Sequence, residues 1–168
     1  MLLLSTPPVS KKFTHAGVPE NKRSYSSVWK DEAIGTGHAR STIDSPQAWS
    51  AKTNQPGEWI QLDLGQERWV AGTMIQPRSP EWGIQYVTEY TVSTSLDGKN
   101  WTAVPGKYIG DAKLTSENKF SNGALVGARY VRMIVTKWTN HISLRADVLI
   151  ATGKYIRNDK QMNEHTRY

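Results

Sequence analysis

The clearest pattern in this chain is a period-two alternation of apolar and polar residues over short segments. In residues 58–64, Ile60 and Leu62 alternate with Gln61 and Asp63. Successive side chains of a β-strand point to opposite faces, so this pattern predicts a strand with one buried face.

The same alternation recurs along the chain, with turn signals between the segments. The further predicted strands are residues 68–76, 86–95, 100–104, 129–135 and 144–150. Asp97-Gly98 is a hairpin signal between two of them, and Gly65-Gln66 is expected to separate the first two. In residues 86–95 the alternation places on one face Tyr86, Thr88, Tyr90 and Val92. No segment has a helical period, so the pattern predicts an all-β sandwich.

Four short stretches of the chain resemble a known family in the same order. They are residues 26–29, residues 48–51 with 57–65, residues 95–102, and residues 138–149. Together they cover about Tyr25 to Ile150, and they resemble discoidin domains, the C-type modules of coagulation factors V and VIII. The resemblance implies an eight-stranded antiparallel jelly-roll β-sandwich, galactose-binding-like, that binds a ligand and catalyses nothing.

Composition and charge suggest how the chain is organised. The chain has 168 residues, of which 38% are hydrophobic and 21% charged. This length and composition predict one globular domain. We divide it into a basic extended arm at residues 1–24, a discoidin-like domain at 25–151 and a basic tail at 152–168. The net charge of +6 lies mostly in the two arms. Basic arms favour acidic partners and docking into a larger assembly, although they also serve solubility alone.

The chain contains no cysteine. This excludes disulfides, thiolate catalysis and cysteine-based zinc sites. Extracellular discoidin domains usually join their ends by a disulfide; here Ser24 and Ala151 occupy those neighbourhoods. The apolar run after Met1 is too short for a signal-peptide core, and no run is long enough for a membrane span. We therefore expect an intracellular protein, soluble or assembly-bound, or an extracellular one if the chain is a processed form.

Two loops are the candidate binding region, since sandwiches present ligand-binding loops at one end of rigid sheets. They are residues 30–39 and 77–85. Resemblance to sugar-binding discoidin relatives implies ligand contacts from the second loop, through Arg78, Glu81 and Trp82. A sugar needs an aromatic face for its C–H patch and charged groups for its hydroxyls. Trp82 is expected to supply the face, and Arg78 and Glu81 the donor and the acceptor.

His38 and Asp44 are expected to approach the same ligand from the first loop and the segment after it. Against this stands the alternative that Trp82 packs on its own loop while Arg78 and Glu81 pair with each other. Phospholipid-binding relatives instead present bare apolar spikes. Here the apolar loop residues lie beside charges, which makes membrane insertion the weaker expectation.

Four polar residues are interpreted as structural. The resemblance implies that Asn140 and His141 brace the loop before the last strand. Asp63 and Arg145 lie in strands that should be largely buried, and buried charges need polar or oppositely charged partners. Core packing is the expected role of Trp49, Trp59, Trp101 and Trp138.

Metal and catalytic chemistry are not expected. Some family members bind calcium near the start of the domain, where Asp31, Glu32 and Asp44 are weak candidates here; no other metal or cofactor is predicted. No nucleophile with a paired base is visible, so the chain is not expected to be an enzyme. No specific nucleic-acid motif is recognised.

The sequence therefore predicts a non-catalytic recognition module that binds a glycan or a protein partner through its rim loops. The alternative is a structural subunit of a large intracellular assembly, for example cytoskeletal or ciliary, docked through its basic terminal arms.

Overall fold

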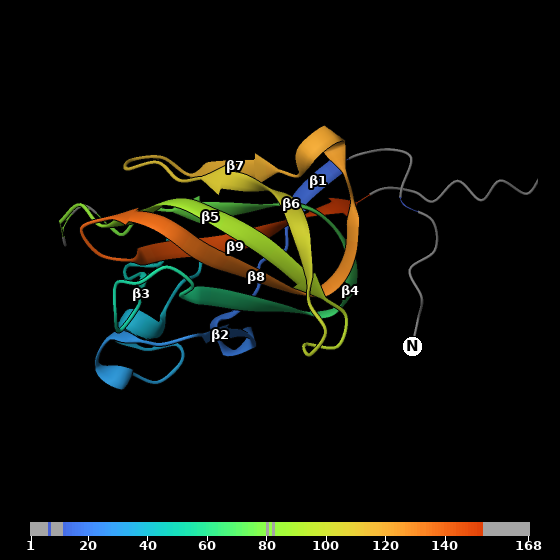
Figure 1. The fold of residues 1–168 in the computed structure, drawn as a ribbon. Helices are drawn as coiled ribbons and strands as arrows, with labels where there is room; N and C mark the ends of the chain where they lie inside the picture. The colour runs from blue at the N-terminus through green and yellow to red at the C-terminus, as the bar shows by residue number, and fades with distance from the viewer. Residues whose placement is uncertain (1–6, 8–11, 80, 82, 153–168) are drawn as a thin grey trace, which may run out of the picture.

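The computed structural model describes residues 7, 12–79, 81 and 83–152 and shows an all-β, antiparallel fold (Figure 1). The strands are β1 (Lys12–His15), β2 (Arg23–Tyr25), β3 (Trp49–Ser50), β4 (Trp59–Gln76), β5 (Tyr86–Ser95), β6 (Thr102–Ile109), β7 (Ser116–Lys119), β8 (Val126–Thr139) and β9 (Ser143–Thr152). The helical segments are single 3₁₀ turns: η1 (Glu20–Lys22), η2 (Trp29–Asp31), η3 (Gly37–Ala39) and η5 (Ser121–Gly123). None of the helices in these described residues has the length and apolar character needed to cross a bilayer.

The long strand β4 organises the sandwich. Its first part pairs with β2 and β8, and its second part pairs with β9 and β7. A register shift between Asp63 and Arg68 lets the strand bend without ending. The sequence predicted two strands separated at Gly65-Gln66; the structure keeps one bent strand, because a bulge turns the backbone while pairing resumes beyond it.

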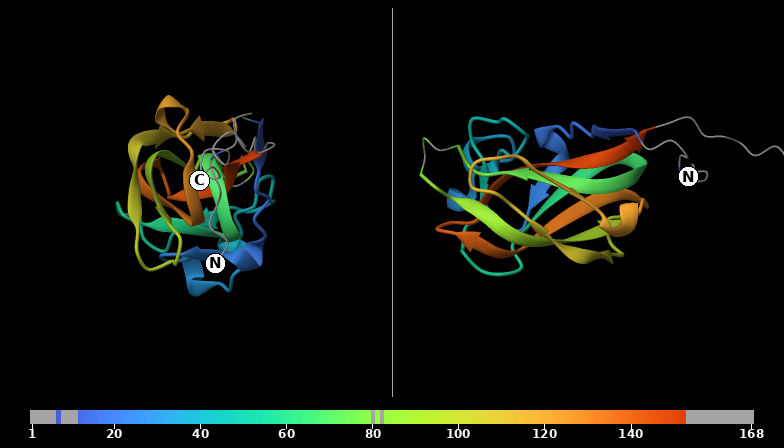
Figure 2. Two further views of the ribbon diagram at one scale, coloured as in Figure 1. Left: turned by 90° about the vertical axis from the view of Figure 1, so that its right-hand side faces the viewer. Right: turned by 90° about the horizontal axis from the view of Figure 1, so that it is seen from above.

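Hydrogen bonding links the strands in the order β1-β9-β4-β8-β5-β6, with β2 and β7 on β4 and β3 on β9. Seen end-on, the strands surround one interior (Figure 2, left). That interior holds the main hydrophobic core, built from nearly every strand, including Trp49, Leu62, Val92, Met133 and Leu144. The predicted all-β sandwich class is confirmed; the described residues form nine hydrogen-bonded strands, of which β3 has two residues.

The apolar alternation sets which face is buried in β8 and β9. Val131, Met133 and Val135 are buried, and Arg132 and Ile134 between them are not. In β9 the core side contains Leu144, Ala146, Val148 and Ile150, as expected. The reverse side of β9 is also buried at Leu149, which packs with Ala71 and Met74 in a smaller apolar cluster.

The face assignment of β5 was partly wrong. Val87 is buried together with Tyr90 and Val92, whereas Tyr86 and Thr88 are half-exposed. The register shifts twice, with one extra residue on β5 between Val87 and Glu89 and one extra residue on β8 opposite Glu89 and Tyr90. A bulge of this kind switches the side-chain phase, which an unbroken period of two cannot anticipate.

The four tryptophans expected in the core divide into two groups. Trp49 is fully buried, and Trp138 packs against the core. Trp59 and Trp101 instead lie outside it, where they sandwich the Arg132 guanidinium at 4.1 and 4.0 Å from the two ring centroids. The reason is position in the pleat: Trp59 precedes core-facing Ile60, so its side chain points to the outer face.

Residues 12–24, assigned to the basic arm from sequence, pack against the domain. β1 pairs with the end of β9, from Lys12 with Thr152 to His15 with Leu149. Arg23 is buried, and its guanidinium donates to the carbonyls of Val18, Ser41 and Ala146. Burial lowers the pKa of Arg23. The exact arm boundaries stay predictions, and residues 153–168 lie outside the described part of the chain.

Candidate functional site

A pocket of about 240 Å³ opens among the loops at one end of the sandwich. These loops carry η2 and η3, residues 77–85 and the β8–β9 connection, and they gather at the left in Figure 1. The lining residues are Trp29, His38, Ser50, Arg78, Gln85 and His141. His38 and Arg78 were predicted from sequence as ligand residues, so the structure brings these two together.

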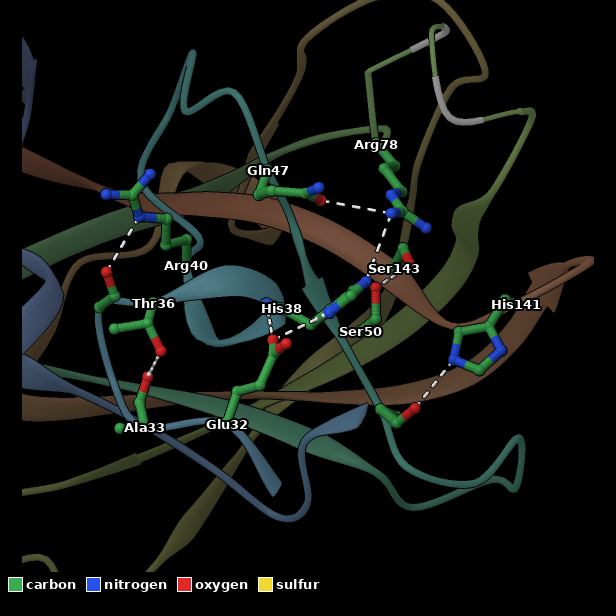
Figure 3. Close-up of polar contacts among 12 residues, drawn as sticks. Glu32, Ala33, Thr36, His38, Arg40, Gln47, Ser50, Arg78, His141 and Ser143 are labelled. Atoms are coloured by element: carbon green, nitrogen blue, oxygen red, sulfur yellow. Dashed lines mark hydrogen bonds and ion pairs between the residues drawn. The ribbon is translucent and has the colours of Figure 1, made fainter. Parts of the chain in front are cut away.

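Glu32 orients His38 (Figure 3). The Glu32 carboxylate accepts hydrogen bonds from the backbone N–H of His38 and, at 2.9 Å, from its Nδ1. These bonds hold the pKa of the Glu32 carboxyl below its usual range. Gly37 makes the approach possible: it has a φ of 42°, and a Cβ there would lie 2.0 Å from the carboxylate. The ring can then accept a hydrogen bond through Nε2.

Arg78 crosses from the second loop to meet this ring. Its Nη2 lies 3.4 Å from His38 Nε2 and donates to Gln47 Oε1 at 3.3 Å, as Figure 3 shows. Its Nη1 donates to Gln85 Oε1 at 2.8 Å. Burial lowers the pKa of Arg78, and an arginine stays charged even so. The pocket therefore has a fixed cationic wall.

Gln85 links this wall to the base of the pocket. Its side-chain oxygen also accepts from Ser143 Oγ at 3.3 Å, and Ser143 Oγ lies 2.7 Å from Ser50 Oγ. Both serines are buried. Hydroxyl and amide groups thus continue the polar surface below Arg78.

His141 combines a bracing role with a place in the pocket. Its Nε2 donates to the Ala51 carbonyl at 2.8 Å, and its Nδ1 accepts from Asn54 at 3.1 Å. Its ring also meets Trp29 edge-on, with the centroids 5.5 Å apart. The neighbouring Asn140 donates to the Ile84 carbonyl at 2.6 Å. The contacts are those of a loop brace, yet His141 faces the pocket, which the sequence did not indicate.

Trp29 supplies the aromatic side of the pocket, and sequence reasoning missed it. Its side chain is 42% exposed. The segment before it is held down by Glu58, a buried residue whose carboxylate accepts from the hydroxyls of Ser26 and Ser27. The core residue Trp49 adds a bond from its indole N–H to the Ser27 carbonyl at 2.8 Å. Residues 26–29 were noted in the sequence only for their resemblance, because the anchoring partner Glu58 is distant in the chain and leaves no local signal.

Of the other predicted ligand residues, Asp44 and Glu81 do not line the pocket. Asp44 is exposed and pairs with the Gln76 side chain, whose Nε2 donates to it at 2.8 Å. Glu81 is exposed on the second loop, and its alternative pairing with Arg78 stays a prediction. Trp82 lies outside the described residues.

Asp63 and Arg145 have oppositely charged or polar partners, as expected. Asp63 accepts two hydrogen bonds from Arg129, at 2.9 and 3.1 Å, which lower the pKa of its carboxyl. Arg145 donates to the carbonyls of Pro77 and Ser45, each at 3.0 Å. The Pro77 bond fastens the start of the second rim loop to β9. Their assignment as structural residues remains a prediction.

The three calcium candidates do not converge. Asp31 pairs with Lys52, Glu32 binds His38, and Asp44 binds Gln76. In the described part of the chain, no group of three or more His, Asp or Glu side chains could hold a metal ion. The structure therefore offers the calcium hypothesis no support.

An antiparallel β-sandwich whose end loops surround a pocket lined by aromatic and polar side chains has the architecture of a ligand-binding module. The F5/8 type C domain model matches residues 22–148. The chain belongs to the F5/8 type C domain family, and the resemblance noted from sequence is confirmed.

The chain is similar in sequence to one group of known proteins and in fold to a group of solved structures. Lactadherin of Mus musculus is 33% identical over 145 residues, which are 79% of this chain and 31% of lactadherin. The chain thus spans less than a third of that relative. Discoidin II of Dictyostelium discoideum has a TM-score of 0.58 at 19% identity, covering 88% of this chain and 58% of discoidin II. A family 32 carbohydrate-binding module from C. perfringens, solved with galactose, has a TM-score of 0.60 at 16% identity, covering 82% and 99%.

Proposed function

We propose that this domain is a non-catalytic recognition module that binds a glycan in the rim pocket. The observation that carries the proposal is the convergence of Trp29, Arg78 and His38 on one opening. A pyranose presents an apolar C–H patch and paired hydroxyls, which match an aromatic side chain and neighbouring charge-assisted donors. One structural neighbour was solved with galactose, which supports this class of ligand.

The polar groups of the pocket are held in place before a ligand binds. Glu32 orients His38, and Gln85 with Gln47 holds the guanidinium of Arg78. Groups that are already oriented lose little conformational freedom on binding, which favours affinity. The pocket volume of about 240 Å³ suits a single sugar residue, with the rest of a glycan outside.

The test is a glycan array followed by titration calorimetry with the best ligand, with galactose as the first monosaccharide. We expect Trp29→Ala to weaken binding about tenfold through the lost stacking face. Arg78→Lys is expected to weaken it similarly, because lysine keeps the charge and loses the fork of donors. Trp101→Ala is the matched control, since Trp101 lies on the outer face of the sheet and stacks on Arg132.

Thermal melting of each variant separates loss of the site from loss of the fold. A glycan bound equally by the native chain and by the Trp29→Ala and Arg78→Lys variants would refute the rim pocket as its site. An array without any ligand would refute glycan recognition altogether. A protein captured through the same two residues would then identify the pocket as a protein-docking site.

The alternative of a structural subunit in an intracellular assembly stays a prediction. It depends on the terminal arms, and residues 1–6, 8–11 and 153–168 lie outside the described part of the chain. The comparisons lend no support to that role or to the intracellular placement. A pulldown from native lysate, comparing the intact chain with residues 12–152, tests it: partners lost on trimming would support docking through the arms.

A further inference from the structure

A second pocket, also of about 240 Å³, lies far from the rim site. It is formed by the segment between β1 and η1, the bend of β4 and the end of β9. Figure 1 shows the start of β1 and the end of β9 side by side at the right, away from the rim loops. From Ser143, beside the rim pocket, β9 runs roughly 23 Å to Ile150 in this second pocket.

Part of the surface of this pocket is apolar. Val18 and Ile150 are 3% and 9% exposed and belong to the main core, while Ala16 and Leu64 pack partly exposed against it. The pocket is thus a place where the core comes within reach of a small ligand. Its volume is at the small end for ligand sites.

The backbone donors and the carboxylate near the pocket are already engaged. The N–H groups of Gly17 and Val18 donate to Asp147 at 2.8 and 3.4 Å. Asp63 binds Arg129 through both oxygens and also accepts from the N–H of Gly65 at 2.8 Å. These groups have no strong interaction left to offer a ligand, and the charge of Asp63 is balanced by Arg129.

Two cations also lie at the pocket. Lys22 and Arg68 both line it and are exposed. Neither forms an ion pair within the described residues. The Arg68 guanidinium lies beside the neutral side-chain amide of Gln66, which leaves its charge uncancelled. A partly apolar floor therefore lies beside two exposed cations, of which Lys22 also interacts electrostatically with Asp63.

We propose that this pocket is a second ligand site that takes a carboxylate with a short apolar body. The carboxylate would lie between Lys22 and Arg68, and the apolar body would cover Val18, Leu64 and Ile150. An inorganic anion would leave the apolar residues of the pocket in contact with water, and a neutral apolar molecule would make no charge-assisted contact with Lys22 or Arg68. The site is independent of the rim pocket and of the glycan proposed there.

The chain-length dependence of carboxylate binding tests both parts of the site. Acetate, butyrate and hexanoate are titrated into the full chain and followed by amide NMR shifts, with hexanamide as the uncharged control. We expect shifts at Ala16, Gly17 and Gly65, and an affinity that rises about fourfold per added methylene until the pocket is full. Equal binding of acetate and hexanoate, or of hexanamide and hexanoate, would overturn the proposal, as would the absence of shifts in this region.

The double variant Lys22→Gln, Arg68→Gln tests the cations. We expect hexanoate affinity to fall at least about tenfold, because two charge-assisted contacts are lost. Lys99→Gln removes one charge from an exposed hairpin position and serves as control. Both positions of the double variant are exposed, so its melting temperature should stay near that of the native chain. Unchanged hexanoate affinity in a folded double variant would overturn the proposal.

Two sources can supply this ligand chemistry, a free organic acid or the C-terminal residue of a peptide. A short peptide ending in leucine, its C-terminal amide and hexanoate distinguish them. Tighter binding of the free-carboxylate peptide than of hexanoate indicates a peptide source, and the reverse order indicates a free acid. The amidated peptide is expected not to bind in either case; binding of the amide as tight as that of the acid would contradict the role of the cations.

Discussion

Glu58 provides a direct test of how the rim pocket is supported. It is 5% exposed. Its Oε2 accepts from Ser26 and Ser27, and its Oε1 accepts from Thr53 and Gln55 at 3.0 and 3.3 Å. Burial by itself would raise the pKa of Glu58, but these four hydrogen bonds together hold it below its ordinary value. The substitution Glu58→Gln keeps the shape and replaces one acceptor by an NH₂ group.

The expected loss follows from these contacts. With the NH₂ group toward the serines, it faces oxygens that already accept from the backbone N–H groups of Trp59 and Lys52. With the amide reversed, it faces the Gln55 amide N–H instead. Either way about two charge-assisted bonds disappear, which costs about 2–3 kcal/mol of unfolding free energy after the hydroxyls rotate to other partners. For a chain of this size the melting temperature should fall by roughly 4–12 °C.

The stability difference between Glu58→Gln and the native chain should depend on pH. A carboxyl whose folded pKa is lowered stabilises the fold above its unfolded pKa, and this stabilisation is lost as the pH falls through the folded pKa. The deficit of Glu58→Gln should therefore be full near neutral pH and shrink below about pH 4. Thermal melts followed by circular dichroism at neutral pH and near pH 3 measure it.

Glu67→Gln is the matched control for Glu58→Gln, because no hydrogen bond or ion pair of the Glu67 side chain is found within the described residues. An unchanged melting temperature for Glu58→Gln at neutral pH would refute the reasoning. A deficit that persists undiminished near pH 3 would show that ionisation of Glu58 is not its cause.

Two further substitutions test packing elsewhere in the sheet. Gly72→Ala should destabilise the fold by about 3 kcal/mol or more, because a Cβ there would lie 2.2 Å from the Asn118 carbonyl oxygen. Urea unfolding measures this loss. Native-like stability of the variant would contradict the close approach of β7 to β4. Arg132→Lys should lower the unfolding free energy by about 1 kcal/mol and change the tryptophan fluorescence, since lysine cannot form the planar stack between Trp59 and Trp101. A variant with native stability and an unaltered fluorescence spectrum would contradict the stack.

The two pockets lie at different ends of the sandwich and differ in how their charges are held. At the rim, Arg78 and His38 are fixed by a network of neighbouring side chains. At the far pocket, Lys22 and Arg68 are exposed and lie near the core residues Val18 and Ile150. A domain with sites at both ends can hold one ligand while a second binds, and titration of each site with the other occupied would measure any coupling between them.

The all-β class, most of the strands and the family followed from the sequence alone. The reason is that alternation over four to eight residues is a local property: Leu144 and Ala146 must face the core if Arg145 between them is to reach polar partners. The hairpin at Asp97-Gly98 is equally local, because its turn residues act on their own backbone. Arg78 could be proposed from the resemblance to sugar-binding relatives, and His38 from its place in the neighbouring loop, since sandwiches bind ligands through loops at one end.

Only the tertiary structure decided which of these loop residues meet. His38 and Arg78 are forty residues apart in sequence and 3.4 Å apart at their nitrogens, while Asp44, only a few residues from His38, is bonded to Gln76 instead. Trp29 and His141 both line the pocket, Trp29 on the segment that Glu58 anchors and His141 through its bonds to Asn54 and Ala51. Trp59 and Trp101 lie outside the core, where both stack on Arg132. Such contacts depend on long-range pairing and on bulges that shift the register, and neither leaves a periodic signal in the chain.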